Sequence, residues 1–267
     1  MVAVGPPSTW FPAGDGGAPF VVEVVAPPRP APPAATLRVV TFNVEYSTRT
    51  APLAAALRGH EALARADVVL LQEIGPHAVD GARAGAVADA LGLGYACAHD
   101  LAILCRWPLR DVHVMELPHA RLPYNRRRRL ALSAMIDHAA GPLRVIDVHL
   151  DTRVNIDERI RQLAPAVEAA PDAHVIGGDV NTLPFRFAGG AVPIGRTDQA
   201  AALDAYMGTH GFANPVGAAG HTHRHFLKVR LDALFTRGVT PGRAHVARDV
   251  RVSDHFPVWT DLIVAAR

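Results

Sequence analysis

The stretch at residues 175–181, VIGGDVN, begins as an apolar run and ends in an acid and an amide, Asp179 and Asn181. Apolar and small residues in succession are typical of a strand that is buried on both faces. A carboxylate at the end of such a strand is costly to bury unless it has a partner. The stretch therefore predicts a central strand that delivers polar side chains to one edge of a sheet.

Five further apolar runs meet a carboxylate, an amide or a histidine in the same way. They lead to Asn43, to Gln72 and Glu73, to His149, to Asp232, and to Asp254 and His255. Each case alone fits a structural role, such as a helix cap, an Asx-turn or a buried histidine with its hydrogen bonds satisfied. Six such strand ends in one chain favour a common site over six separate structural roles.

The residue types at these ends suit the chemistry of a phosphate ester. Mg²⁺ prefers hard oxygen ligands and keeps several waters, so one or two carboxylates such as Glu73 and Asp254 are enough to hold it. An attacking water needs a base and an orienting amide, and Asp179 and Asn181 lie two residues apart on one side of an extended segment. Histidines can donate to the charge that builds on the phosphoryl oxygens. Two such donors are present, His149 and His255.

The order of the expected elements indicates the fold. Strands are expected at residues 37–44, 67–72, 102–106, 112–117, 131–137, 143–150, 174–179, 230–236 and 256–264, and helices at 51–65, 79–91, 156–169 and 198–210. Many of these strands are apolar on both faces, which suits burial between a helix layer and a second sheet. The pattern predicts a four-layer α/β/β/α sandwich, and an ordinary doubly wound sheet is the alternative.

The first 35 residues differ from the rest, because nine of the chain's 22 prolines lie there. Since proline can neither pair within a central strand nor continue a helix, residues 1–35 are expected to form an extended leader. An edge strand at residues 20–25 is the alternative. Residues 36–267 are expected to form one catalytic domain, because a chain with 49% hydrophobic residues can bury a large core at this length.

Composition narrows the classes of protein that remain. A formal net charge of +2 gives no global positive field of the kind that strong nucleic-acid binders carry. Cys97 and Cys105 fit neither a disulfide framework nor a zinc site, and we expect ordinary buried thiols. Neither a signal peptide nor a segment long and apolar enough to cross a membrane is found. We therefore expect a cytoplasmic monomer with no integral membrane association.

Seven short motifs run in the order of a known family across residues 37–264. They are TFNV at 41–44, LQE at 71–73, AILCR at 102–106, HL at 149–150, GDVN at 178–181, LDALF at 231–235 and SDHFP at 253–257. In these motifs the sequence resembles the deoxyribonuclease-I-like endonuclease/exonuclease/phosphatase superfamily. The resemblance implies two packed, mostly antiparallel sheets and a phosphoesterase that depends on Mg²⁺, with Mn²⁺ as the alternative ion.

The resemblance also implies roles for individual residues. Glu73 is implied to be the main metal ligand, with Asn43 and Asp254 beside the same ion or the phosphate. Asp179 and Asn181 are implied to position and activate the attacking water.

The remaining roles concern the phosphate. Asp232 is implied to orient His255, and His255 and His149 to contact the scissile phosphate together with Asn181. Which group takes the proton stays shared among them. Arg129 resembles the family's arginine near the phosphate, although its register within the run at residues 126–129 is open, and the other three arginines are expected to form a solvated surface.

Two local features leave alternatives open. Glu45, two residues after Asn43, fits a second-sphere metal ligand and a solvated acid equally well. The alternating His221, His223 and His225 are expected to lie in a polar loop, with a contact to the substrate phosphate or a metal site as alternatives.

The substrate is the least determined property. A nucleic acid, a lipid head group and a sugar phosphate all remain open, so a nuclease acting on DNA or RNA is an alternative to a hydrolase of small phosphate esters. Compact connections such as residues 92–94 speak against the inserted loops with which a nuclease enters a duplex groove. A catalytically silent module that binds phosphate ligands is a second alternative, but none of the acidic or histidine positions is lost. The Gly-x-Ser-x-Gly elbow of a serine hydrolase is absent.

Overall fold

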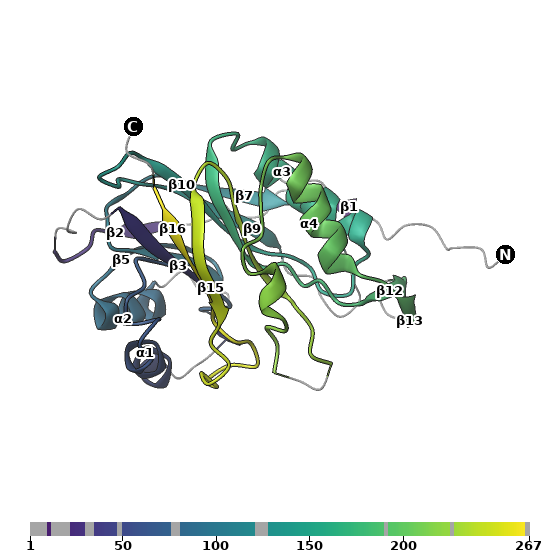
Figure 1. Cartoon of the computed structure of the whole chain (residues 1–267), viewed down its shortest axis with the longest axis horizontal. Coiled ribbons are helices and arrows are strands. Elements are labelled where there is room, and N and C mark those ends of the chain that lie inside the picture. The colour runs from purple at the N-terminus through teal and green to yellow at the C-terminus, as the bar shows by residue number, and fades with distance from the viewer. Residues whose placement is uncertain are drawn as a thin grey trace.

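The fold is built from two large β-sheets that pack face to face. The computed structural model describes residues 10–11, 22–29, 35–46, 50–75, 81–120, 128–189, 192–224 and 227–264. In this part of the chain, helices α1 (Thr50–Gly59) and α2 (Ala82–Leu91) cover the outside of one sheet, and α3 (Ile156–Glu168) and α4 (Gln199–Thr209) cover the outside of the other (Figure 1). The structure thus confirms the predicted four-layer sandwich.

Each sheet has a defined strand order. The seven-stranded sheet runs β15 (Thr240–Val246), β16 (Val258–Ile263), β3 (Thr36–Asn43), β4 (Val68–Gln72), β6 (Leu101–Cys105), β5 (Gly94–Ala98) and β2 (Glu23–Val25). The five-stranded sheet runs β14 (Asp232–Thr236), β11 (Ala173–Asp179), β10 (Leu143–His149), β9 (Arg129–Ile136) and β7 (Leu109–Leu117). Most neighbouring strands are antiparallel, as expected.

Three separate hydrophobic cores hold the four layers together. Along β3, Val39 lies in the core between the two sheets, whereas Val40 lies in the core under α1 and α2. Along β10, Val145 and Ile146 divide in the same way between the central core and the core under α3 and α4. Because successive side chains of a strand point to opposite faces, strands that are buried on both sides must be apolar throughout.

The two parallel strand pairs of the fold place the polar strand ends at one edge. Strand β3 pairs in parallel with β4, with Asn43 opposite Gln72, and β10 pairs in parallel with β11, with His149 opposite Asp179. Strand β14 runs antiparallel to β11 and begins with Asp232 opposite Asp179. Parallel strands end at the same edge of a sheet, so each sheet gathers its polar strand ends at one edge. The two edges lie next to each other where the sheets pack together.

Gly178 allows the close approach of β10 and β11 just before Asp179. Its φ of +142° is rarely adopted by residues with a side chain, and a Cβ at this position would lie 1.9 Å from the carbonyl oxygen of Val148. Only glycine therefore fits here. This requirement explains the glycine at the start of the GDVN motif.

The observed elements differ from the sequence-based prediction in a few places. Strands β5 and β15 were not predicted, because GYACA is rich in small residues and TPGRAHV contains Pro241 and Gly242. Helix α1 ends at Gly59, and turns replace the expected last turns up to residue 65. Of the predicted edge strand at residues 20–25, the structure shows β2 (Glu23–Val25), which pairs with β5, and residues 20 and 21 lie outside the described residues.

Two short ladders complete the described structure. Strand β1 (Trp10–Phe11) pairs with β8 (His119–Ala120), and β12 (Phe185–Ala188) pairs with β13 (Val192–Arg196) beside α4. A short 3₁₀ helix, η1, spans Gly217–Ala219. None of the helices in the described ranges combines the length and the apolar character that a bilayer crossing requires. Cys97 and Cys105 are buried free thiols, as predicted.

Candidate active site

A cleft of about 420 Å³ lies at the edge where the polar strand ends meet. Its lining residues are Asn43, Glu45, Glu73, Arg129, His149, Thr152, Asp179, Asn181, Leu183, His223, Leu231, Asp254 and His255. Both sheets contribute, and eight of the nine predicted site residues are among them. The ninth, Asp232, lies directly behind His255.

Asp179 is the centre of the hydrogen-bond network in this cleft. Its Oδ2 accepts from Asn43 Nδ2 at 2.9 Å, which joins the two sheets, and its Oδ1 accepts from the backbone N–H of Asn181 at 2.9 Å. The Nε2 atoms of His149 and His255 lie 3.7 Å and 3.8 Å from Asp179 Oδ2. One carboxylate oxygen thus lies near two histidines, while two donors fix the position of the carboxylate.

His255 and Asp232 form the predicted contact. The Nδ1 of His255 lies 2.9 Å and 3.1 Å from the two carboxylate oxygens of Asp232. Burial lowers the pKa of His255, but the negative charges of Asp232, Asp179 and Asp254 outweigh it and raise the pKa to about 10. His255 is therefore a protonated donor at neutral pH in the metal-free protein.

His149 has a partner that the sequence reasoning missed. Its Nδ1 lies 3.2 Å from Asp100 Oδ2, and Asp100 also contacts the Nδ1 of His99 at 2.9 Å and the hydroxyl of Tyr46 at 3.3 Å. Burial would raise the pKa of Asp100, but its contacts with the two histidines hold it well below the ordinary value. Asp100 stands directly before β6, whose first residue pairs with Gln72, so the start of this antiparallel strand was the available signal.

Glu73 directly follows β4 in a strained conformation, and its side chain lines the cleft. Its φ is +59°, and Glu45 and Asn181 also have positive φ values, +52° and +51°. Such backbone angles are uncommon outside glycine and concentrate at functional sites. Burial raises the pKa of Glu73, aided by the charge of Asp179 and opposed by His149, whose Nε2 lies 3.6 Å away.

Glu45, Asp254 and His223 form the outer wall of the cleft. The backbone N–H of Asp254 donates to Glu45 Oε2 at 3.0 Å, and His223 Nε2 lies 3.4 Å from Asp254 Oδ2. The ring of His223 packs edge-on against His255 with centroids 5.0 Å apart. The histidine loop therefore brings one member into the site. His221 lines a neighbouring cleft, and His225 lies outside the described residues.

The structure describes two arginines of the basic run, and of these Arg129 lines the cleft. Its buried guanidinium donates from Nε to Asp151 Oδ1 at 2.7 Å. Arg128 instead pairs with Glu116. Arg126 and Arg127, which were predicted to form a solvated surface with Arg128, lie outside the described residues.

The sequence was compared with protein-family models and with solved structures. The model of the endonuclease/exonuclease/phosphatase family matches residues 40–255. This chain belongs to that family. Its hydrolases act on phosphate esters, and the matched range contains every residue named above as a lining or partner residue of the cleft. No curated protein sequence matches the chain at a significant level.

Several solved structures share the fold. An endonuclease/exonuclease/phosphatase protein from Beutenbergia cavernae is 21% identical, with a TM-score of 0.68 over 86% of this chain and 72% of that one. TDP2 from D. rerio, complexed with a single-strand DNA product, is 18% identical, with a TM-score of 0.60 over 86% and 99%. The endonuclease domain of TRAS1, a telomere-specific non-LTR retrotransposon, is 14% identical, with a TM-score of 0.53 over 86% and 99%. At these identities the likeness establishes the family fold alone.

Divalent metals are general cofactors of the endonuclease/exonuclease/phosphatase family, and the cleft contains groups that can hold one. Among the described residues, the ligand atoms of His223, Asp254 and His255 lie within 4.8 Å of one another, and so do those of Asp179, Asp232 and His255. Glu73, the predicted main ligand, belongs to neither group of three. A Mg²⁺ ion needs only one or two carboxylates beside water and substrate, so this spacing is compatible with Glu73 as a ligand.

Proposed function

We propose that this protein is a Mg²⁺-dependent phosphoesterase that cleaves a P–O bond by in-line attack of water. The observation that carries the proposal is the convergence of strand ends from both sheets on one cleft, joined by the hydrogen bond from Asn43 to Asp179. A silent binding module has no need of the complete set of acids and histidines that the cleft retains.

The donor set supports a Mg²⁺ site at Glu73, Asn43 and Asp254. Carboxylate and amide oxygens are the ligands that this ion prefers, and Mn²⁺ accepts the same donors. Burial and the neighbouring Asp179 raise the pKa of Glu73, so a divalent cation would relieve the cost of its ionised form. The ion supplies neutralisation of the charge on the phosphoryl oxygens when it is bound.

Asp179 and Asn181 are proposed to position the attacking water. The two donors on Asp179 fix the orientation of its carboxylate, which can then accept a proton from a water in the cleft. Asn181 Nδ2 donates to the carbonyl oxygen of Leu150 at 3.0 Å, which holds the amide in one rotamer. Its backbone N–H and side chain thereby connect Asp179 to Leu150, the residue directly after β10.

The charge that develops on the phosphate is proposed to meet three donors. Protonated His255, held by Asp232, can donate from Nε2, and the Nε2 of His149 lies at a similar distance from Asp179. Arg129 supplies a fixed positive charge at the wall of the cleft, because Asp151 holds its guanidinium. These three side chains would stabilise the charge that develops on the phosphoryl oxygens.

The test is hydrolysis of bis(4-nitrophenyl) phosphate with and without metal. We expect turnover with Mg²⁺, its loss in EDTA, and its return when Mg²⁺ is restored. Glu73→Gln and Asp179→Asn should each lower kcat by at least about a hundredfold, because each removes a charge from the reacting centre. Glu61→Gln changes an exposed carboxylate after α1 and serves as the matched control.

Circular dichroism and thermal melting of the same variants separate chemistry from folding. Hydrolysis that persists in EDTA, or near-wild-type kcat in a folded Asp179→Asn protein, would contradict the proposal. Tight binding of phosphate esters without turnover under any metal would favour the silent module.

A further inference from the structure

A second and larger cleft, of about 730 Å³, lies directly beside the candidate active site. Thr182 and Pro184 line this cleft, whereas Asn181 and Leu183 line the active site. The same alternation occurs between Arg230 and Leu231 and between His221 and His223. Because side chains alternate along an extended segment, a wall one chain thick separates the two clefts.

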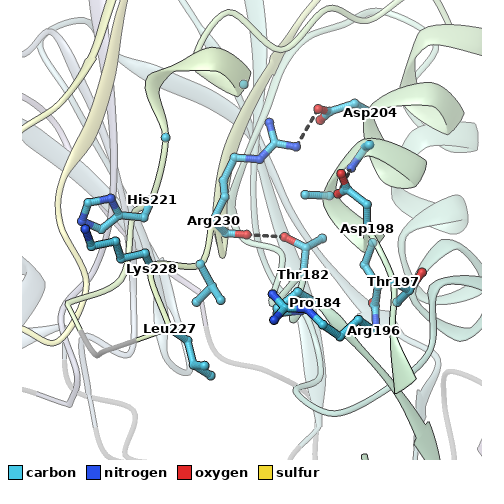
Figure 2. Close-up of a pocket in the computed structure, with 16 residues that line it drawn as sticks. Thr182, Pro184, Arg196, Thr197, Asp198, Asp204, His221, Leu227, Lys228 and Arg230 are labelled. Atoms are coloured by element: carbon cyan, nitrogen blue, oxygen red, sulfur yellow. Dashed lines mark hydrogen bonds and ion pairs between the residues drawn. The ribbon is translucent and has the colours of Figure 1, made fainter. Parts of the chain in front are cut away.

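The two clefts carry opposite charge. Glu45, Glu73, Asp179 and Asp254 give the active site four carboxylates. The second cleft instead gathers three cations, Arg196, Lys228 and Arg230, together with His221 (Figure 2). An acidic cleft next to a basic cleft is expected where the first holds a metal ion and the second holds an anion.

The two carboxylates of the second cleft already have partners. Asp198 caps α4 by accepting from the backbone N–H of Ala201 at 2.9 Å. Asp204 accepts from Arg230 Nη2 at 2.6 Å and from Asn214 Nδ2 at 2.9 Å, and Figure 2 shows the first of these contacts. Asp204 is thus paired with Arg230, whereas Asp198 keeps its negative charge, so the three cations of the cleft exceed its two carboxylates by one.

Three features favour an anion in this cleft. Neither Arg196 nor Lys228 forms an ion pair within the described ranges, and the buried Nη1 of Arg230 has no hydrogen-bond acceptor there. Lys228 has a φ of +42°, a strained conformation for a residue with a side chain. Burial lowers the pKa of His221, and the positive charges of Arg248 and Lys228 lower it further.

The first turn of α4 adds to this field. Gln199, Ala200 and Ala201 line the cleft, so the amino end of the helix opens into it. Backbone N–H groups at a helix start lack intrahelical partners and attract anions, and at the start of α4 the N–H of Ala201 already donates to Asp198. In Figure 2 the segment from Arg196 to Asp198 faces His221 and Lys228 across the cleft, with Arg230 between them.

We propose that the cleft lined by Arg196, Lys228 and Arg230 binds a second phosphate group of the substrate while the acidic cleft holds the scissile one. This inference rests on the proposed function and narrows its substrate class to compounds with at least two phosphates close together. Adjacent phosphates of a single nucleic-acid strand and the phosphates of a sugar or inositol bisphosphate share this chemistry. Among the described lining residues, Phe, Tyr and Trp are absent and the cations Arg196, Lys228 and Arg230 are present, which favours recognition of a phosphate.

The experiment compares substrates with one and two phosphates. Bis(4-nitrophenyl) phosphate is the one-phosphate substrate, and a short single-stranded oligonucleotide and an inositol bisphosphate are the two sources of a second phosphate. The variant is Arg196→Gln combined with Lys228→Gln. Its charge-matched control is Arg58→Gln combined with Arg243→Gln, which removes two exposed arginines on α1 and β15.

We expect the first double variant to raise KM for a two-phosphate substrate at least about tenfold more than KM for the aryl diester. The affected source, oligonucleotide or inositol bisphosphate, identifies the substrate class. For the oligonucleotide, the salt dependence of KM should also weaken, because fewer counterions are released. Equal KM changes for substrates with one and with two phosphates, or equal effects of the control, would overturn the inference.

Binding to Asp179→Asn with Mg²⁺ separates the two proposals. If the wild-type protein hydrolyses none of the substrates, the proposed function fails. The second cleft still stands in that case if Arg196→Gln and Lys228→Gln weaken binding of the oligonucleotide or the bisphosphate at least about tenfold. If Arg196→Gln and Lys228→Gln leave binding unchanged in the Asp179→Asn protein, the proposed second phosphate site is wrong, whatever the outcome for the proposed function.

Discussion

The two histidines of the active site occupy similar positions but are held differently. His255 and His149 both direct Nε2 toward Asp179, at 3.8 Å and 3.7 Å, and both have Nδ1 against a buried carboxylate. Both oxygens of Asp232 lie against His255, and Asp232 is completely buried.

The carboxylate behind His149 is divided among several partners. Asp100 contacts His99 and Tyr46 as well as His149. Asp232 directs both oxygens to one histidine, whereas the two oxygens of Asp100 are divided among three partners. We therefore propose that His255 carries the larger part of the chemistry and His149 the smaller.

The largest expected effect comes from removing His255. His255→Ala should lower kcat about a thousandfold, because it deletes the charged donor beside Asp179 and leaves Asp232 buried without its partner. His149→Ala should cost about a hundredfold or less. The kcat of both variants is measured on bis(4-nitrophenyl) phosphate with saturating Mg²⁺. Equal losses of kcat would contradict the proposed difference between the two histidines.

A smaller effect concerns the pH dependence of stability in the metal-free protein. The folded-state pKa of His255, about 10, lies above its unfolded value of about 6.5. The stabilisation from its charge is therefore complete below about pH 6.5 and is lost as the pH rises through about 10. Asp232→Asn should destabilise the protein by a few kcal/mol, on the order expected for a buried pair, near pH 6.5, and by less above pH 10.

Urea unfolding of wild type and Asp232→Asn in EDTA, at a series of pH values, measures this difference. The difference in the free energy of unfolding between the two proteins should shrink above pH 10. A difference that stays constant from pH 6.5 to above pH 10 would contradict the charge assigned to His255.

The smallest expected effect is that of Asp100→Asn. An amide keeps an acceptor for His149 Nδ1 while losing the charge, so kcat should fall less than about tenfold. Asp232→Asn is the same substitution in the other pair and should cost at least about tenfold more. A reversed order would mean that the shared carboxylate, not the dedicated one, supports the chemistry.

The sequence predicted the central strands and their polar ends because both follow from local pattern. Runs such as residues 175–178 are apolar on both faces, and the acid or amide that ends them stands out. Strands β5 and β15 lack such a pattern, because small residues, a proline and exposure hide them. Local propensity carries little information about a strand whose stability comes from its neighbours.

Asp100 and His223 show the same limit within the site. Asp100 precedes a strand instead of ending one, and only the antiparallel pairing of β6 with β4 brings it to the cleft. His223 was one of three alternating histidines, and the backbone bridge between His223 and His255 selects it. Both contacts depend on pairing between distant segments, which residue order alone does not specify.

The hydrogen bond from Asn43 to Asp179 ties a residue of one sheet to a residue of the other. The separation of Asp179 and the Asn43 amide therefore depends on the separation of the two sheets, and side chains such as Leu70 fill the space between these sheets. A loosened core between the sheets would therefore misalign the residues of the cleft before any strand unfolded.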